Sequence, residues 1–330
     1  MKIGIIGTGW VAGHHLDAFG KIDGVEVVAI AGRNEVRGRE LAEPSGAKVY
    51  GEVLPMLERE SLDAVAILLP PHLHGELEVV CSEHVGAVLV EKPVSQSMEA
   101  AERAHEAFKR AGTLVAVGYM NRYRRAVDVA RGVFKADGDP GVMAHGWWIT
   151  RMPPPMWWRS FEQSGGQFVE QCTHLVDLSR YVFGEIVEVS AWRTGGRMEG
   201  VAGFSVDDAM VVNARFASGA LGSFCTGCYP LGGHAEGGGG IGLTFSARQH
   251  RLVMSGWNLE GTMHCGEDEV EGLPVDEDVF VRQNRAFVEA VWTGDRGLVR
   301  SDYGDAMKTL AVTLAANESA RERGGAPVAC

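Results

Sequence analysis

The sequence predicts two domains, an α/β domain with a parallel sheet followed by an α+β domain built on a mainly antiparallel open sheet. Over the first third of the chain, short apolar runs alternate with helical patterns, as in a parallel sheet with crossover helices. Later segments alternate apolar and polar residues, which is typical of an antiparallel sheet with one buried face. The length of 330 residues also allows two separate hydrophobic cores.

Each predicted element of the first domain follows from a local pattern in the sequence. We expect strands where short apolar runs end at turn residues, and helices where apolar residues recur at helical spacing. The predicted strands are Lys2–Gly7, Val25–Ala31, Lys48–Tyr50, Asp63–Leu69, Val85–Val90 and Leu114–Gly118. The predicted helices span residues 12–20, 34–43, 51–59, 74–83 and 98–111. The last helix has the clearest ends, because Ser97 can cap its start and Gly112 can close it.

The second domain is predicted over residues 123–330. A loop rich in Trp and Pro, from Trp147 to Trp158, leads into a helical run over Gly166–Phe183. The strands predicted after it are Val187–Arg193, Ala209–Phe216, Ala220–Cys228, Gly242–Ala247 and Arg251–Ser255. The helices predicted to close the chain are Asp278–Trp292 and Tyr303–Glu322. We expect that the last helix can pack back on the first domain.

A glycine pattern follows the first predicted strand and opens a helix. Gly7 allows a tight turn, Gly9 lets the backbone approach a pyrophosphate, and Ala12 allows close packing of helix and strand. The pattern predicts a dinucleotide site of Gly7, Thr8, Gly9, Trp10, Val11 and Ala12, and therefore a Rossmann domain over residues 1–122. A turn that binds nothing is the alternative.

Gly237–Gly240 lacks a following Lys-Ser/Thr and helix, so we interpret it as a connection rather than a phosphate cradle.

The second predicted strand ends in Ile30-Ala31-Gly32-Arg33-Asn34, where NAD sites usually carry an acid for the ribose 2′-hydroxyl. The first acid here is Glu35, whereas Arg33 can pair with a 2′-phosphate or stack on adenine. The sequence therefore predicts NAD(P) as cofactor and favours NADP. The alternative is that Arg33 is only a solvated residue at a helix start.

Loops at the same edge of a parallel sheet line the cofactor crevice. At the end of the fourth predicted strand lie Leu69 and Pro70, which we expect to contact the cofactor. His74 has two equal interpretations, contact with the nicotinamide half or capping of the next helix.

Glu91-Lys92-Pro93 follows the apolar run Val85–Val90. A lysine at the carboxyl end of a buried parallel strand faces the ligand crevice, where partial desolvation suits it for proton transfer. Pro93 restricts Lys92 to extended geometry and allows a cis peptide bond. We therefore predict that Lys92 is catalytic and that Glu91 and Lys92 both lie at the cofactor.

Glu170, His174 and Asp177 fall at i, i+4 and i+7 of the predicted helix, so we expect them on one face. Such a polar stripe on an otherwise apolar helix is costly unless its members have partners. His174 can act as general acid/base near neutral pH when a neighbouring acid orients it. The alternatives are a satisfied structural His–Asp pair and a solvated helix face.

Composition excludes several other classes of function. The net charge of −12 argues against nucleic acid and anionic membranes as partners. No apolar stretch approaches the length of a membrane span, and Ile3–Ile6 is too short for a signal-peptide core, so we expect a cytoplasmic protein. Cys225 and Cys228 have a CxxC spacing that His264 and Cys265 could extend, but without a second CxxC we predict no metal site.

Together these motifs resemble the Gfo/Idh/MocA oxidoreductase family over nearly the whole chain. The segments that carry the resemblance are Gly7-Thr8-Gly9-Trp10, Glu91-Lys92-Pro93, Gly118-Tyr119-Met120-Asn121-Arg122-Tyr123, the helix with His174 and Asp177, and Asn317-Glu318-Ser319-Ala320. The resemblance implies reversible oxidation of a sugar or polyol hydroxyl by NAD(P). It also implies an open sheet that often forms an oligomer interface, and hence a homodimer or homotetramer.

The family's catalytic lysine corresponds to Lys92 and its catalytic histidine to His174. Three positions depart from the family pattern. Glu170 stands where Asp is common, Cys172 replaces a glycine, and Pro71 replaces an asparagine that often contacts the cofactor. Glu170 keeps the charge of an aspartate but extends the carboxylate by one methylene, and its expected role is to orient His174 or to bind substrate.

The predicted mechanism is hydride transfer between the nicotinamide and a carbinol carbon. The catalytic residues would be Lys92, His174 and Glu170; the substrate site would consist of Lys92, Tyr119, Arg122, Trp158, Arg159, Glu170, His174 and Asp177. His174 would take the hydroxyl proton, and Lys92 would stabilise the developing alkoxide. The loop with Trp157 and Trp158 could stack on a pyranose ring or could instead be anchored in the core.

Two other functions remain open. A tightly bound cofactor could oxidise a glycoside transiently to drive its hydrolysis or elimination. A protein on the same fold could instead sense the cofactor without catalysis, because a fold alone does not determine a function.

Overall fold

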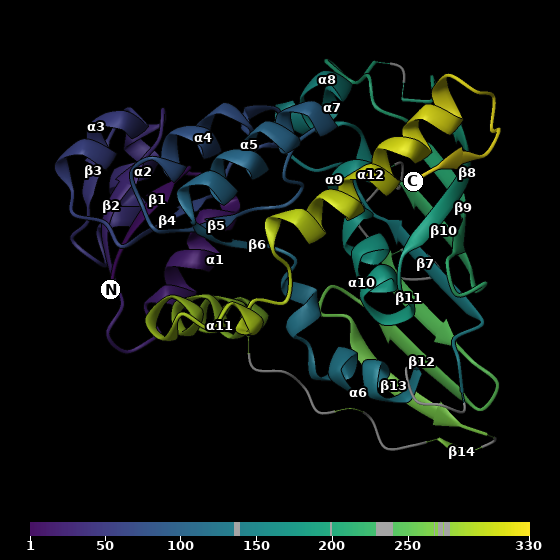
Figure 1. The fold of residues 1–330 in the computed structure, drawn as a ribbon. Coiled ribbons are helices and arrows are strands. Elements are labelled where there is room, and N and C mark those ends of the chain that lie inside the picture. The colour runs from purple at the N-terminus through teal and green to yellow at the C-terminus, as the bar shows by residue number, and fades with distance from the viewer. Residues whose placement is uncertain (135–138, 199, 229–239, 267, 270–272, 274–277) are drawn as a thin grey trace. The chain divides into compact units, whose positions relative to one another are not determined.

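The computed structural model describes residues 1–134, 139–198, 200–228, 240–266, 268–269, 273 and 278–330 (Figure 1). Its strands form two sheets. Six parallel strands make the first sheet, in the order β3-β2-β1-β4-β5-β6. They are β1 (Lys2–Ile6), β2 (Glu26–Ala31), β3 (Lys48–Tyr50), β4 (Ala64–Ile67), β5 (Ala87–Val90) and β6 (Leu114–Val117). The predicted Rossmann sheet is confirmed.

Helices connect these strands as the alternating pattern predicts. They are α1 (Trp10–Phe19), α2 (Glu35–Ala42), α3 (Val53–Arg59), η1 (Pro71–Leu73), α4 (Glu76–Ser82) and α5 (Met98–Ala111), and η2 (Met120–Tyr123) follows the last strand. The predicted ends of α5 are confirmed, because Ser97 Oγ accepts the Ala100 N–H and Gly112 is left-handed with φ of 72°. β4 and β5 are buried at every position, as expected for central strands covered on both faces.

The second sheet has nine strands in the order β14-β13-β12-β11-β7-β10-β9-β8-β15. They are β7 (Met143–Ile149), β8 (Ile186–Thr194), β9 (Ala209–Phe216), β10 (Leu221–Gly227), β11 (Gly240–Ser246), β12 (His250–Ser255), β13 (Glu260–Cys265), β14 (Asp268–Glu269) and β15 (Val328–Ala329). Apart from the parallel pair β7 and β10, neighbouring strands run antiparallel. The prediction of a mainly antiparallel sheet is confirmed.

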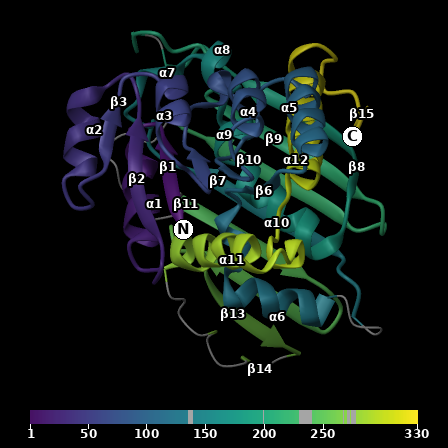
Figure 2. The same cartoon turned by 60° about the vertical axis from the view of Figure 1, so that its left-hand side comes forward.

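Helices cover one face of this second sheet (Figure 2), where α10 packs on β7 and β10, and α6 packs on β13. The helices around it are α6 (Arg125–Phe134), α7 (Met156–Arg159), α8 (Phe161–Ser164), α9 (Gln167–Glu170), α10 (Thr173–Phe183) and most of α12 (Tyr303–Arg321). The core between the sheet and α10 includes Leu175, Val212 and Phe245, all fully buried or nearly so.

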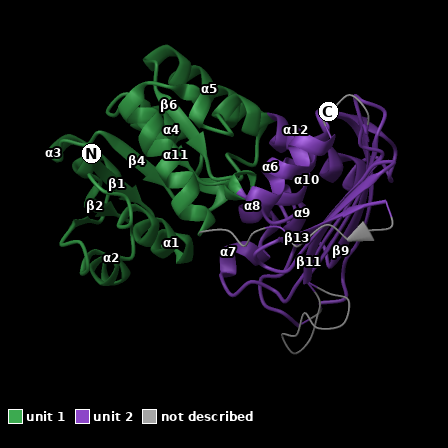
Figure 3. Ribbon diagram, turned by 90° about the horizontal axis from the view of Figure 1, so that it is seen from below, with its two compact units in different colours: residues 1–123, 277–307 green, residues 124–276, 308–330 purple. Residues whose placement is uncertain are grey.

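The chain folds as two compact units (Figure 3), residues 1–123 with 277–307 and residues 124–276 with 308–330. The first boundary lies one residue from the predicted one. The prediction assigned α11 (Val279–Thr293) and η3 (Arg296–Leu298) to the second domain, whereas the structure places both in the first unit. The reason is packing, because α11 lies on α1 and its Phe287 joins the core of the first sheet.

Two predictions for the second unit are wrong. Trp147 and Trp148 lie in β7 rather than in a loop. The predicted helix over Gly166–Phe183 is interrupted between α9 and α10, because the Cys172 N–H bonds to Gln167 O, a wider turn than in an α-helix. Glu170 therefore ends one helix while His174 and Asp177 belong to the next.

Of the predicted Gly237–Gly240 connection, residues 237–239 lie outside the described residues and Gly240 begins β11. In the part of the chain that the structure describes, we find no helix with the length and hydropathy needed to span a membrane.

Candidate active site

The turn between β1 and α1 requires glycine at residue 7. Gly7 has φ of 116°, a region that other residues rarely adopt. A Cβ atom on Gly7 would also lie 2.3 Å from the carbonyl oxygen of Leu68. The Gly7 N–H donates to Ala31 O at 2.8 Å, which ties the turn to the end of β2.

The amino end of α1 is open to solvent. Gly9 and Trp10 are exposed, and a Cβ atom on Gly9 would meet no atom within 4 Å. The first turn of α1 carries no acidic side chain, so nothing opposes the attraction of its free N–H groups for phosphate. Thr8 packs over Gly32, and Ala12 is fully buried. This part of the chain fits a dinucleotide pyrophosphate.

Arg33 is exposed beyond the end of β2. The next residue, Asn34, uses its side-chain oxygen to accept the Arg37 N–H at 3.1 Å and so caps α2. Glu35, the nearest acid, forms an ion pair with Arg39 at 3.2 Å. Arg33 is therefore the first charged side chain after β2, and the acid that follows it already has a cationic partner.

His74 follows η1 and its side chain is buried. Its Nδ1 bonds to Glu78 Oε1, and its Nε2 bonds to Leu69 O at 3.0 Å. Burial alone would lower the pKa of His74, but the charge of Glu78 and these hydrogen bonds raise it overall. Both ring nitrogens are used within the first unit, which favours the structural interpretation of His74. Leu69 and Pro70 are half-buried just after β4.

Glu91 directly follows β5 and is buried. Its carboxylate contacts His15 Nε2 at 3.0 Å and accepts the backbone N–H of Lys92 at 3.1 Å. It also lies so close to Gly118 that a Cβ atom there would be 2.6 Å from Glu91 Oε1. Glu91 thus fixes the backbone from which Lys92 projects. The Lys92–Pro93 bond is cis, and Lys92 itself is half-buried.

Tyr119 and Arg122, predicted to bind substrate, are only 1% and 2% exposed. The Arg122 guanidinium forms an ion pair with Asp305 at 2.6 Å and donates to Arg300 O at 2.5 Å. These contacts within the first unit connect the end of the Rossmann sheet to the start of α12. A contact of either residue with substrate stays a prediction.

In the second unit, His174 lies in the first turn of α10 and is buried. Its imidazole stacks on the indole of Trp148 in β7, with ring centroids 5.7 Å apart and planes 19° apart. Ring stacking restricts the orientation of the imidazole, which the general acid/base role predicted for His174 would require. Trp148 supplies one face of that support.

Glu170, at the end of α9, accepts a hydrogen bond from Trp158 Nε1 at 3.0 Å. Trp158 is 1% exposed and packs with Val206 and Cys228. Of the two interpretations of the Trp-rich loop, the structure therefore favours an anchor in the core at Trp158. Arg159 is half-buried at the end of α7.

Asp177 is buried one turn further along α10. It accepts a hydrogen bond from Thr309 Oγ1 at 3.0 Å, and Arg180 donates to the same hydroxyl at 2.6 Å. Thr309 is a partner that the sequence analysis missed, because it lies 132 residues away and a lone threonine gives no local signal. Asp177 thus connects α10 to α12.

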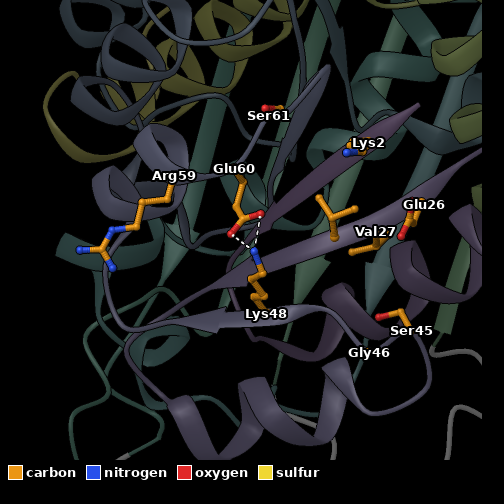
Figure 4. A pocket seen from close by; sticks show the side chains of 10 residues that line it. Lys2, Glu26, Val27, Ser45, Gly46, Lys48, Arg59, Glu60 and Ser61 are labelled. Atoms are coloured by element: carbon orange, nitrogen blue, oxygen red, sulfur yellow. Dashed lines mark hydrogen bonds and ion pairs between the residues drawn. The ribbon is translucent and has the colours of Figure 1, made fainter.

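The described residues also hold a hollow that is not the predicted site (Figure 4). Its lining includes Lys2, Glu26, Val27, Ser45, Gly46, Lys48, Arg59, Glu60 and Ser61. Lys48 Nζ bonds to both carboxylate oxygens of Glu60, at 2.9 and 3.1 Å. The hollow lies at the amino ends of β1, β2 and β3, whereas open α/β sheets bind ligands at the carboxyl ends. We assign it no role in cofactor binding.

Cys225 lies in β10 and Cys228 just after it. Burial raises the pKa of the Cys228 thiol to about 12 and also raises that of Cys225, so both are protonated at neutral pH. His264 and Cys265 lie in β13, which β12, β11 and β7 separate from β10. Within the described ranges, no three His, Cys, Asp or Glu side chains are grouped to hold a metal ion.

Two family models match the sequence. Residues 1–119 match the model described as an oxidoreductase family with an NAD-binding Rossmann fold. Residues 138–241 match the model of the GFO/IDH/MocA C-terminal domain. The two matches fall on the two predicted domains in the same order.

Curated relatives include inositol dehydrogenases. The chain is 32% identical over 232 residues to myo-inositol 2-dehydrogenase of Thermotoga maritima, an alignment that covers 67% of each chain. It is 27% identical over 194 residues to scyllo-inositol 2-dehydrogenase (NAD(+)) of Bacillus subtilis, which covers 58% of this chain and 56% of the relative. The chain therefore spans little more than half of the second relative's length and two thirds of the first.

A solved structure of levoglucosan dehydrogenase in complex with NADH has the same fold. It superposes with a TM-score of 0.86 over 100% of this chain and 98% of the other. The sequence identity is 19%, so this likeness establishes the fold and no more.

Proposed function

Because the chain belongs to the Gfo/Idh/MocA family of oxidoreductases, we propose that it is an NAD(P)-dependent dehydrogenase of a sugar, polyol or sugar derivative. The observation that carries the proposal is the combination of an open glycine turn at α1 with a Lys92 backbone held by Glu91 and a His174 ring stacked on Trp148. A cofactor-binding protein without catalysis would need the first feature but not the second.

In the proposed reaction the nicotinamide supplies the hydride acceptor, or the donor in the reverse direction. His174 accepts the proton of the substrate hydroxyl at an imidazole nitrogen. Lys92 Nζ donates a hydrogen bond to the same oxygen and stabilises the developing alkoxide by its charge. Glu170, held by Trp158, binds a substrate hydroxyl or orients the imidazole, and the more deeply buried Asp177 keeps α10 in place.

The proposal includes NADP as the favoured cofactor. Arg33 is exposed where the ribose 2′-position is expected, and a guanidinium suits a phosphate. Glu35 pairs with Arg39, which makes it a poorer ligand for a 2′-hydroxyl. NAD remains compatible with the glycine turn, since that turn contacts only the pyrophosphate.

We further propose that the protein is a homodimer or homotetramer that associates through the outer face of the second sheet. Across adjacent strands this face carries exposed apolar side chains, Trp192 of β8, Val211 of β9 and Leu221 of β10. Such a patch marks a contact surface in soluble proteins. Light scattering coupled to size exclusion would measure the mass, and Val211→Asp should reduce it to that of a monomer.

The function is tested by incubating the protein with each oxidised cofactor and a panel of inositols, aldoses and anhydrosugars. Net appearance of reduced nicotinamide with at least one of them supports the dehydrogenase. Cleavage of a glycoside with no net reduction would indicate instead the transient-oxidation chemistry. Cofactor binding without either reaction would contradict the proposed function and favour a sensor.

A further inference from the structure

An exposed tryptophan lies in the turn that joins β12 to β13. Trp257 is 63% exposed, and the sequence analysis gave it no role. The Gly256 N–H donates to Ile241 O at 2.9 Å, and Ile241 of β11 pairs with Trp148 of β7. The turn is therefore bonded to the residue that lies opposite Trp148 in the sheet, and Trp148 is the residue that stacks on His174.

Ring contacts link these residues directly. The Trp257 and Trp148 indoles meet edge to face, with centroids 6.2 Å apart and planes 71° apart. Trp148 in turn stacks on His174. All three residues belong to the second unit, so the series of rings depends on no other part of the chain.

The turn itself is held in place. Leu259 is 2% exposed and donates its N–H to Gly256 O at 3.1 Å. It adopts φ of 46°, a left-handed conformation that costs a branched residue free energy. A buried side chain in such a conformation indicates that packing determines the path of the turn and keeps Trp257 at the surface.

We propose that Trp257 determines substrate specificity by receiving the apolar C–H face of a ring-shaped substrate, a cyclic polyol or a pyranose. The inference rests on the proposed function and deepens it. An indole face suits the C–H side of such a ring, while the ring hydroxyls remain free for polar groups. Trp148 contacts both Trp257 and His174, so a ring against Trp257 is separated from the proposed general acid/base by one indole.

Other tryptophans lack this combination. Trp158 is buried and bonded to Glu170. Trp192 and Trp292 are exposed, but among the ring contacts of the described residues neither is joined to His174. Among the described tryptophans with printed ring contacts, Trp257 alone is both exposed and joined to His174 through Trp148.

The test combines binding and turnover for Trp257→Ala, Trp257→Phe and the matched surface control Trp292→Ala. Saturation-transfer NMR on myo-inositol, glucose and 1,6-anhydroglucose reports which ring protons touch the protein. Trp257→Ala should abolish transfer to one face of the ring and lower kcat/KM for the best ring substrate about tenfold, the equivalent of one aromatic contact. Trp257→Phe should retain most of both, and Trp292→Ala should match the wild type.

Oxidation of open-chain polyols such as mannitol separates specificity from damage to the site. If Trp257→Ala lowers ring and open-chain turnover equally, it disturbs Trp148 and His174 instead, and the proposal is overturned. Unchanged saturation transfer in Trp257→Ala, or no transfer to any ring in the wild type, also overturns it. Transfer that depends on Trp257 without cofactor reduction would support the ring site while refuting the dehydrogenase.

Discussion

The glycine turn of the first unit, proposed to bind the cofactor, and helices α9 and α10 of the second unit, proposed to carry catalytic residues, position their candidate functional groups in different ways. In the turn, the backbone is the functional group, and Gly7 and Gly9 act by lacking a side chain. In the helices, candidate side chains are held by side chains of other helices, as Trp158 of α7 holds Glu170 and Thr309 of α12 holds Asp177. A requirement of the backbone is visible in the local sequence as a glycine, whereas the partner of a buried side chain cannot be recognised from the residues around it.

The largest expected effect comes from a side chain at Gly7. Gly7→Ala places Cβ against Leu68 O in a left-handed conformation, so we expect the free energy of unfolding to fall by about 3 kcal/mol or more. Urea denaturation measures this. Gly9→Ala is the matched control, because its Cβ meets no atom and only the helix cap changes, at a cost of about 1 kcal/mol.

The variants Gly7→Ala and Gly9→Ala together separate an effect on folding from an effect on cofactor binding. Gly9→Ala should remain folded yet bind NADH and NADPH at least about tenfold more weakly, because its methyl group occupies the approach of the pyrophosphate. Full cofactor affinity in Gly9→Ala would show that the turn does not contact the cofactor through its backbone.

In the second unit, Trp158→Phe keeps the buried ring but removes the indole N–H that Glu170 accepts. Loss of a hydrogen bond to a carboxylate should cost about 2 kcal/mol of unfolding free energy and lower turnover. Trp292→Phe, on the surface of α11, is the control and should change neither quantity. Equal stability of Trp158→Phe and the wild type would remove Trp158 as the support of Glu170.

A smaller and pH-dependent effect is expected at Asp139. Burial would raise the pKa of its carboxyl, but hydrogen bonds from His250 and from the backbone N–H groups of residues 248–250 hold that pKa below its usual value. Because the folded pKa is the lower one, the carboxylate stabilises the fold above the pH at which the unfolded chain titrates. This stabilisation disappears as pH falls through the folded pKa.

Asp139→Asn should therefore be less stable than the wild type at neutral pH and equal to it in strong acid, as measured by urea denaturation of both proteins across pH. A difference that persists at low pH would mean that the carboxylate charge is not what fixes the turn before β12.

The smallest expected effect is at Arg33. Arg33→Ala should weaken NADPH binding about tenfold, the loss of one charged contact to a phosphate, and leave NADH within about twofold. Titration by energy transfer from the tryptophans to the nicotinamide measures both. Parallel loss of both cofactors, or of neither, would contradict the assignment of NADP.

Much of the first unit could be predicted from sequence. Its strands and helices lie within a few residues of the expected bounds, because each strand is a short apolar run and each turn has a glycine, proline or capping residue. The segment of α11 was assigned to the other domain, since an amphipathic helix does not indicate which core it joins.

The second unit was harder to predict. β7 alternates buried and exposed residues, but His145 and Gly146 interrupt its apolar pattern. The break after Glu170 depends on a single hydrogen bond from Cys172 to Gln167, for which the helical spacing gives no sign. Of the functional candidates, Trp257 was missed because a tryptophan in a turn acquires its meaning only through Trp148.

The central claim is that backbone in the first unit binds the cofactor while Lys92 and His174 perform the chemistry. The most direct test measures turnover and cofactor affinity together for Lys92→Ala and His174→Ala. We predict that turnover falls at least about a hundredfold in each, with cofactor affinity within about threefold of the wild type. Substantial residual turnover in either variant would contradict its catalytic role, and a collapse of cofactor affinity in His174→Ala would contradict the division between the two units.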